Sequence, residues 1–417
     1  MTKKIVFIFI LLSVSINLLY AQFVYENRVY SPIIKTVILE QSGNTLSDPV
    51  IYLNSHKKLK LSFDELSEET HRYEYTLIHC EADWTESDLD QSLYIEGFET
   101  QKIEGFENSF NTIQRFVHYS QNIPSNDMTI TKSGNYIVKV FEEGNPDKVI
   151  LTRRFYCVDD KSNIAVEVKP SIDVSIMHTH QDVNVKVEGK NGYFFQNPDE
   201  YMKVVCVQNG REDLKHLLKA RGTSGASIDF SFDRSNQFPG GNEFRYFDFT
   251  SLRYKTPYVA KLDYFNGENQ VFLRPEKDRK TLAYATDKDF NGDFFVRNEY
   301  NEDNATYSDY AWVHFTLPKE YSLEGSYYVV GSMTDWRMSE QNKMTFDNNA
   351  YHLSLYLKQG IYSYQILFAP TSETNATAMV EGNHSETNNV YKVFIYYKNF
   401  SDNYDELVGF SSVEYRK

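Results

Sequence analysis

The stretch Tyr73–Trp84 reads YEYTLIHCEADW and is the clearest indication of the fold class. Tyr73, Tyr75 and Leu77 occupy alternate positions, and this period of two is typical of a β-strand with one face turned to a core. Asp83 and Trp84 follow as a turn in which the tryptophan acts as an aromatic anchor. The stretch therefore predicts a β-rich domain built around this strand.

The rest of the sequence extends this prediction to the whole chain. Its 417 residues include 32 Tyr and 29 Phe, which suit pleated and half-buried surfaces. Short apolar segments recur at intervals of about ten residues, separated by Asn, Gly, Asp and Pro. They include Tyr136–Phe141, Val149–Val158, Tyr201–Gln208 and Tyr310–Leu317. We predict an all-β fold of tandem immunoglobulin-like or early-set β-sandwich domains.

The domain organisation is predicted from the N-terminal signal and from shifts in composition. Lys3 and Lys4 precede the apolar run Ile5–Ile16, and Ala21 offers a small residue for cleavage. We expect a signal peptide over residues 1–21, an N-terminal sandwich over 22–158, a middle sandwich over 159–280 and an early-set-like sandwich over 281–417. No later segment is long and apolar enough for a spanning helix, which predicts an exported protein without direct membrane insertion.

The formal net charge of the chain is −15. An acidic chain repels phosphate backbones, so we expect no nucleic-acid partner. The charge could steer the protein toward basic partner surfaces or could serve only solubility, and the sequence leaves both interpretations open.

Three cysteines, Cys80, Cys157 and Cys206, lie in alternating apolar segments, where buried free thiols are the usual outcome. A disulfide between Cys80 and Cys157 stays open, because an exported protein meets an oxidising compartment and spacing does not decide the pairing.

No catalytic, cofactor-binding or metal-binding residue is predicted. His178 and His180 would share a face on a strand, but two ligands without a third favour a polar loop. Asp287–Asn291 followed by Gly292 matches the start of a calcium loop, yet Asn298 occupies the position that needs a bidentate carboxylate. A β-hairpin with Asn-Gly at its tip explains the same residues, with strands at Leu282–Thr286 and Phe290–Val296.

A small-molecule alternative rests on Trp336, which ends the string GSMTDW at residues 331–336. An exposed tryptophan can stack on a sugar, whereas a tryptophan in an early-set pattern more often packs at the end of the sandwich. Packing is the favoured interpretation, also for Trp84 and Trp312.

Five strings carry a family resemblance, and they occur in the family's order. They are IHCEADW at 78–84, LYIEGF at 93–98, NSFNT at 108–112, FPGGNEFRYFD at 238–248 and DELVGF at 405–410. The turn at Asp289–Phe294 and the whole end Tyr391–Gly409 belong to the same pattern. Together they resemble the Plug family of the Bacteroidota type IX secretion system.

This resemblance implies a non-enzymatic protein without a cofactor, monomeric when alone. Such a protein would bind and seal the periplasmic opening of the giant outer-membrane β-barrel translocon and would dissociate during substrate export. Its expected location is periplasmic, on the inner side of the outer membrane through the translocon. The alternative, based on GSMTDW, is a secreted glycan-binding β-sandwich protein.

Overall fold

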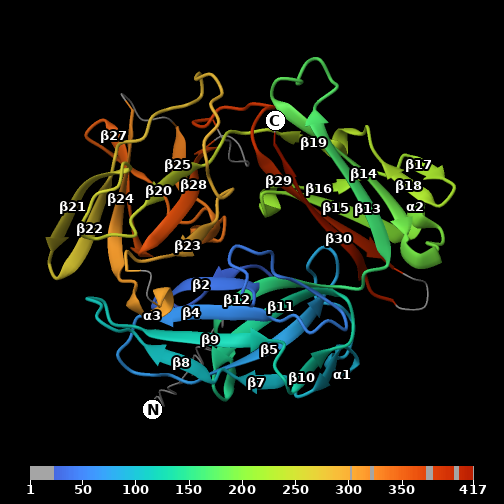
Figure 1. Cartoon of the computed structure of the whole chain (residues 1–417), viewed down its shortest axis with the longest axis horizontal. Helices are drawn as coiled ribbons and strands as arrows, with labels where there is room; N and C mark the ends of the chain where they lie inside the picture. The colour runs from blue at the N-terminus through green and yellow to red at the C-terminus, as the bar shows by residue number, and fades with distance from the viewer. Residues whose placement is uncertain (1–22, 301–302, 320–323, 372–378, 399–402, 417) are drawn as a thin grey trace, which may run out of the picture.

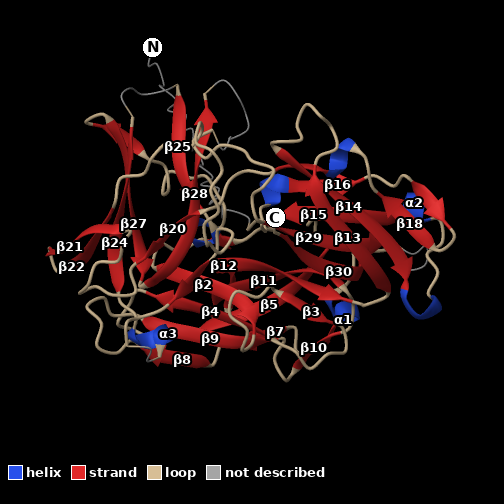
Figure 2. Cartoon of the chain, turned by 45° about the horizontal axis from the view of Figure 1, so that its top comes forward, coloured by secondary structure: helices blue, strands red, loops and turns tan. Residues whose placement is uncertain are grey.

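The computed structural model describes residues 23–300, 303–319, 324–371, 379–398 and 403–416. The expected signal peptide at 1–21 lies outside the described residues. Strands dominate, and each helix in the described residues is only three or four residues long. The strands form three two-sheet sandwiches that we call lobes 1, 2 and 3 (Figures 1 and 2). The prediction of an all-β, sandwich-based chain is confirmed. Among the described residues, no helix has the length and hydrophobicity required to cross a bilayer.

Lobe 1 lies at the bottom of Figure 1 and comes from the first part of the chain. Its larger sheet has the order β1 (Arg28–Val29), β12 (Asn145–Val158), β11 (Gly134–Glu142), β5 (Tyr73–Cys80) and β7 (Thr100–Lys102), and β3 (Val50–Tyr52) pairs with β12. The facing sheet has the order β2 (Ile34–Gln41), β4 (Leu59–Glu65), β9 (Val117–Ile123) and β8 (Gly105–Asn108). Helix α1 (Gln91–Tyr94) leads into β6 (Ile95–Gly97), which pairs with β10 (Met128–Ile130).

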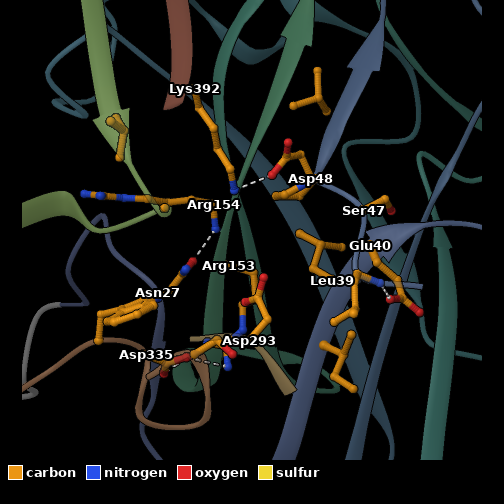
Figure 3. Close-up of a pocket in the computed structure, with 18 of the residues that line it drawn as sticks. Asn27, Leu39, Glu40, Ser47, Asp48, Arg153, Arg154, Asp293, Asp335 and Lys392 are labelled. Carbon is orange, nitrogen blue, oxygen red and sulfur yellow. Dashed lines mark hydrogen bonds and ion pairs between the residues drawn. The ribbon is translucent and has the colours of Figure 1, made fainter. Parts of the chain in front are cut away.

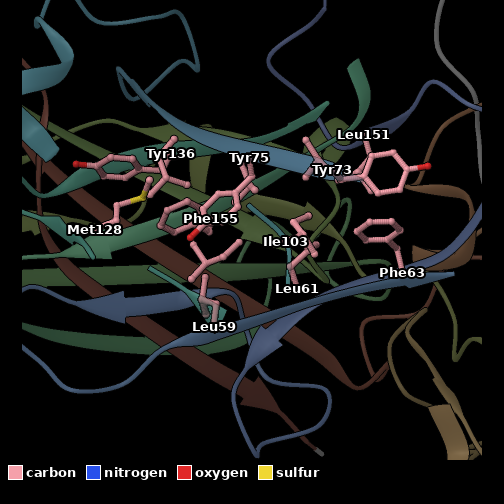
Figure 4. Packing of buried hydrophobic residues seen from close by; sticks show 14 of the residues in the cluster. Leu59, Leu61, Phe63, Tyr73, Tyr75, Ile103, Met128, Tyr136, Leu151 and Phe155 are labelled. Carbon is pink, nitrogen blue, oxygen red and sulfur yellow. The ribbon is translucent and has the colours of Figure 1, made fainter. Parts of the chain in front are cut away.

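Aromatic and aliphatic side chains together fill the core of lobe 1 (Figure 4). The alternation that predicted β5 is observed, since Tyr75 and Leu77 are fully buried. The rings of Phe63 and Tyr119 stack with centroids 5.0 Å apart, and the Tyr73 ring meets that of Tyr119 edge-on at 5.1 Å. Offset and edge-to-face contacts of this kind add to the stabilisation from area burial.

Lobe 2 lies at the right of Figure 1. One sheet has the order β13 (Ser162–Pro170), β14 (His180–Gly189), β18 (Ser227–Phe230) and β17 (Gly222–Ser224), with β19 (Gln237–Pro239) paired to β14. The other has the order β16 (Lys215–Leu218), β15 (Met202–Gln208), β29 (Asn389–Tyr397) and β30 (Glu406–Tyr415). The short helices are η1 (Lys190–Gly192), α2 (Pro198–Tyr201), η2 (Glu212–Leu214) and η3 (Arg234–Asn236).

Lobe 3 lies at the left of Figure 1. One sheet has the order β20 (Arg245–Asp248), β28 (Gly360–Pro370) and β23 (Phe294–Val296), and β25 (Gly325–Val330) also pairs with β28. The other has the order β21 (Val259–Phe265), β22 (Glu268–Leu273), β24 (Tyr310–Pro318), β27 (Ala350–Lys358) and β26 (Thr345–Asp347). Its short helices are α3 (Asn304–Tyr307) and η4 (Ser332–Thr334).

The strand pairing does not follow the three consecutive domains that we expected from the sequence. The C-terminal strands β29 and β30, expected in the domain 281–417, complete the sheet of β15 in lobe 2. Strands β20, β21 and β22, expected in the domain 159–280, pair within lobe 3. Lobe 3 is therefore inserted into lobe 2, and the chain crosses between these two lobes twice.

The prediction of a β-hairpin over residues 282–296 is wrong. Leu282–Thr286 forms no strand, and β23 pairs with β28 instead. Asn291 and Gly292 do form a tight turn, with φ of 51° and 86°. The segment before this turn does not pair with β23, because it is bonded to residues 243 and 244. The Tyr284 hydroxyl donates to Glu243, and the Asp289 carboxylate accepts from the Phe244 amide.

A buried ion pair joins lobe 1 to lobe 3. Lys358 Nζ of β27 lies 2.5 Å from Asp64 Oδ2 of β4, and both side chains are about 1% exposed. Tyr310 donates its hydroxyl hydrogen to the same oxygen at 2.7 Å, and the His118 ring nitrogen Nδ1 lies 2.7 Å from Oδ1. The Lys358 ammonium also lies 4.0 Å from the Phe116 ring centroid. Burial raises the pKa of Asp64, but Lys358 and His118 outweigh burial and hold that pKa below its usual range.

Replacing Lys358 with Met should lower the free energy of unfolding by about 3–5 kcal/mol, because the Asp64 charge then stays buried without its main partner. Lys169→Met, which removes an exposed pair with Glu167, is the control and should cost at most about 0.5 kcal/mol. Urea unfolding at pH 7 measures both variants. Equal effects would show that the Asp64 pair does not stabilise the contact between lobes.

Candidate functional site: the lobe interfaces and the central pocket

The contact between lobes 1 and 2 is built from the IHCEADW segment and the C-terminal DELVGF segment. Asp405 Oδ2 accepts a hydrogen bond from the Ala82 amide at 3.1 Å, and the Asp405 amide donates to Glu81 Oε2 at 2.8 Å. Lys203 of lobe 2 pairs with the same Asp405 carboxylate at 2.8 Å. Beside these contacts the Tyr156 and Phe394 rings stack at 4.2 Å. These two segments, far apart in the sequence, therefore meet at one interface.

His79 of the same segment is a structural residue. It is fully buried, with Nε2 3.1 Å from the Ser133 carbonyl oxygen and Nδ1 2.8 Å from the Ser87 hydroxyl. The neighbouring Gly134 has φ of 148°, and a Cβ there would lie 2.3 Å from His79 Nε2. Burial lowers the pKa of His79 to about 4, so the ring is neutral at pH 7.

The two chain crossings between lobes 2 and 3 contact each other. On the outgoing crossing, the Gly241 amide donates to Asn383 Oδ1 at 2.7 Å and Asn242 Nδ2 donates to the Glu381 carbonyl at 2.8 Å. Gly240 packs so closely that a Cβ would lie 2.0 Å from the His384 carbonyl oxygen. Gly241 has φ of 66°, a left-handed conformation that glycine adopts without strain, while the backbone over residues 240–244 is extended without a turn.

An ion-pair network lies beside these crossings. Glu381 is fully buried and pairs with Arg245 at 2.9 Å and with Arg279 at 2.5 Å. Burial raises the pKa of Glu381, but the two guanidinium groups outweigh it and hold that pKa below its usual range. Arg245 also pairs with Glu276, whose other carboxylate oxygen accepts from the Tyr364 hydroxyl. Glu381 therefore fixes the returning crossing to the first strand of lobe 3.

A pocket of about 220 Å³ lies where the three lobes meet (Figure 3). Lys392 of lobe 2 pairs there with Asp48 of lobe 1, and Arg153 of lobe 1 pairs with Asp335 of lobe 3 at 3.2 Å. Asp293 also lines the pocket, and burial raises its pKa. Opposite charges from different lobes thus face each other across the pocket and hold the lobes together.

Trp336 lies at the edge of this pocket, and its predicted packing role is confirmed. Its ring meets that of Phe244 edge-on at 5.7 Å, and the Arg211 guanidinium lies 5.5 Å from its centroid. A Cβ on Gly292 would lie 2.1 Å from the ring. These contacts occupy part of the ring, and Trp336 is half-buried.

The other two tryptophans also pack. Trp84 is 4% exposed, contacts Tyr156 edge-on and carries the Arg154 guanidinium 4.2 Å from its ring centroid. Trp312 contacts Tyr356 and donates its indole hydrogen to Glu268 at 2.9 Å.

The cysteines are buried free thiols. Cys80 on β5 and Cys157 on β12 lie on opposite sides of β11, two strand spacings or about 10 Å apart. A disulfide needs Cα atoms within about 7 Å, so these two do not pair in this fold. Burial raises the pKa of both thiols to about 12, and it raises that of Cys206 as well. None is a reactive thiolate near neutral pH.

The structure separates the remaining candidate ligands. His178 lies exposed in a turn, while His180 begins β14 with its Nδ1 2.9 Å from the Thr179 hydroxyl. In the calcium-like segment, the Asp289 carboxylate instead caps backbone amides of Asn291 and Phe244. Within the described residues no group of three or more His, Cys, Asp or Glu side chains is arranged to hold a metal ion.

Comparisons with known proteins agree with the resemblance. Residues 34–159, which make up nearly all of lobe 1, match the family model for the first domain of the type 9 secretion system plug protein. A crystal structure of a hypothetical protein from Parabacteroides merdae is 32% identical, with a TM-score of 0.91 over 94% of this chain and all of that chain. No curated protein matches this chain.

These findings define the class as a β-sandwich secretion-system component. The chain belongs to the type 9 secretion system plug protein family, and its role is that of a plug in type IX secretion.

Gly292→Ala should destabilise the protein by at least about 2 kcal/mol, because the new methyl group meets the Trp336 ring in addition to the strain of φ +86°. Gly267→Ala is the matched control, with φ of +83° and open space around the Cβ, and should cost about 1 kcal/mol. Thermal unfolding of both variants compares them. Equal costs would mean that Trp336 moves away freely.

Asp289 should make stability depend on pH. Burial raises its pKa to about 7, above the value of about 4 in an unfolded chain, so the folded protein binds more protons between these limits. Stability therefore falls as the pH rises from 5 to 8, by up to a few kcal/mol from this group. Asp289→Asn should flatten the curve, as measured by urea unfolding at both pH values. An unchanged slope would assign the pH dependence to other groups.

Proposed function

We propose that this protein binds the periplasmic opening of the outer-membrane translocon barrel of the type IX system, seals it when idle and dissociates during export. The observation that carries the proposal is that three segments of the family resemblance, IHCEADW, DELVGF and FPGGNEF, take part in contacts between lobes. IHCEADW meets DELVGF between lobes 1 and 2, and FPGGNEF meets the returning chain between lobes 2 and 3. These segments therefore hold the three lobes against one another.

A rigid body of this size is suited to sealing a wide opening. A compact chain of this length has a radius of gyration of about 22 Å, hence a breadth of about 55 Å. Rigid sandwiches lose little conformational entropy on docking. Little of the free energy gained from the contact is therefore spent on ordering flexible segments. A seal over a wide opening should exceed the ~1,600 Å² of a standard complex, while release requires a polar rim.

A non-enzymatic role is supported by the state of the reactive groups. The three thiols are buried, with their pKa values raised, and the imidazole of His79 is buried, neutral and held by two polar partners. The central pocket is lined by ion pairs between lobes. These features serve the fold.

A tagged copy of the protein should recover the large barrel protein from outer membranes dissolved in mild detergent. Deleting the gene should make the outer membrane more permeable to large hydrophilic antibiotics, and the wild-type copy should restore the barrier. An unrelated periplasmic protein with the same tag controls for nonspecific capture. The proposal fails if the barrel is never recovered and the permeability stays unchanged. Binding of a polysaccharide that is lost in Trp336→Ala would favour the glycan-binding alternative instead.

A further inference from the structure

Lobe 1 carries a groove that shares no lining residue with the central pocket. It consists of two recesses of about 560 Å³ and 390 Å³, which share Ser42, Lys58 and Asn122 and are therefore continuous. Both volumes lie within the range of about 300–1,000 Å³ that is usual for ligand sites. The groove, which we call the polar groove, is formed by the segments that follow β2, β3 and β9 together with residues of β4, β7 and β9.

Amides and hydroxyls dominate the lining of the polar groove. They include the side chains of Gln101, Ser120, Gln121, Asn122 and Asn126. None of the described residues that line the groove is aliphatic or aromatic. Ligand sites are usually lined mainly by apolar side chains, and protein interfaces are anchored by aromatic ones. The polar groove therefore suits neither a hydrophobic ligand nor the apolar anchor of a protein partner.

This lining matches the chemistry of a carbohydrate. A ligand that covers the amides has to supply hydrogen-bonding groups in return, because a polar group buried without a partner costs free energy. Side-chain amides both donate and accept hydrogen bonds, as sugar hydroxyls do. A sugar ring carries a hydroxyl on most of its carbon atoms and can therefore meet several lining groups at once. Two joined recesses also leave room for more than one sugar unit.

Positive charge is in excess in the polar groove, although the chain as a whole is acidic. The charged residues that line it are four lysines and two acids, Lys57, Lys58, Lys60, Lys102, Glu104 and Asp127. Lys102 pairs with Glu143 at 2.5 Å, whereas Lys58 Nζ donates to the neutral Asn126 Oδ1 at 2.5 Å. Among the described residues, no carboxylate forms an ion pair with Lys58 or Lys60. These two amines are therefore available to an anionic group of a ligand.

One large apolar side chain lies beside the groove. The Phe98 amide donates to the Asp127 carbonyl at 3.0 Å, and Phe98 is 67% exposed. Proteins that bind a bilayer surface insert a whole apolar face, and a single ring supplies much less contact area. The groove therefore suits a glycan better than a lipid surface.

We propose that the polar groove binds an acidic glycan. Lys58 and Lys60 contact its carboxylate or phosphate groups, and the amides of Gln101, Gln121 and Asn122 contact its hydroxyls. The groove lies wholly within lobe 1, so the glycan is a second partner beside the translocon. The inference concerns the free protein and does not depend on translocon binding.

The test is titration calorimetry with the purified protein at low ionic strength. The probe is the soluble fragments that muramidase releases from peptidoglycan, an acidic glycan of the periplasm, and chitotetraose is the neutral counterpart. The wild type should bind the acidic fragments at least about tenfold more tightly than chitotetraose, and added salt should weaken this binding. The double variant Lys58→Gln with Lys60→Gln should bind the fragments at least about tenfold more weakly than the wild type, because two charge-assisted hydrogen bonds are lost.

The matched control is Lys186→Gln with Lys219→Gln in lobe 2. Both lysines are exposed, and no described carboxylate forms an ion pair with either of them. This variant has the same change in net charge and should bind within about twofold of the wild type, because distant exposed charges are screened. The melting temperature of both variants should stay within a few degrees of the wild type, which separates lost binding from lost folding.

The outcomes separate this inference from the proposed function, because no translocon is present in the titration. Absence of binding to the acidic fragments overturns the inference, and so does equally tight binding of chitotetraose. Equal weakening by the two double variants would show a nonspecific effect of charge and would overturn it as well. Binding to vesicles of anionic phospholipid, lost in Lys58→Gln with Lys60→Gln and without binding to the fragments, would assign the groove to a lipid headgroup instead.

Discussion

The pairing of β15 with β29 is the constraint on which the rest of the structure depends. It joins Val204 to Ile395, so lobe 2 is complete only after the chain has passed through lobe 3 and returned. Lobe 3 is thereby tied to lobe 2 at both of its ends. The same return places β30 and Asp405 against the IHCEADW segment of lobe 1. One long-range ladder therefore sets the positions of all three lobes.

The contacts between lobes are polar as well as apolar, and the polar contacts fix how the lobes are placed relative to one another. A buried pair such as Asp64–Lys358 gains little net free energy over a well-packed apolar pair, because both charges lose their hydration. Its geometry, however, admits one arrangement only, since Tyr310 and His118 also contact the carboxylate. The network around Glu381 acts in the same way between lobes 2 and 3. Such contacts favour a single relative position of the lobes, which a seal of fixed shape needs.

Much of the local structure could be predicted from sequence. The alternation in Tyr73–Cys80 and Tyr310–Leu317 predicted strands that are present, because one buried face imposes a period of two. Trp336 was expected to pack, and its ring contacts that of Phe244.

The long-range arrangement could not be predicted. Nothing local in the last strands indicates that they complete the sheet of Met202–Gln208, so the expected boundary at residue 280 does not follow the sheets. The segment Leu282–Thr286 has a strand-like pattern, but Tyr284 and Asp289 bond to the crossing chain instead. The strings IHCEADW and DELVGF were recognisable in the sequence, but only the structure shows that they contact each other between lobes 1 and 2. The polar groove of lobe 1 likewise has no signal in the sequence, because the segments that line it are far apart along the chain.

The central claim is that the three lobes form one rigid body in the free protein. The most direct test is a distance distribution between spin labels on Phe194→Cys in lobe 2 and Phe346→Cys in lobe 3, two exposed positions. The native thiols are buried and should not react with the label. The account predicts a single narrow distribution that stays unchanged up to the onset of unfolding. A broad or two-peaked distribution under native conditions would contradict it.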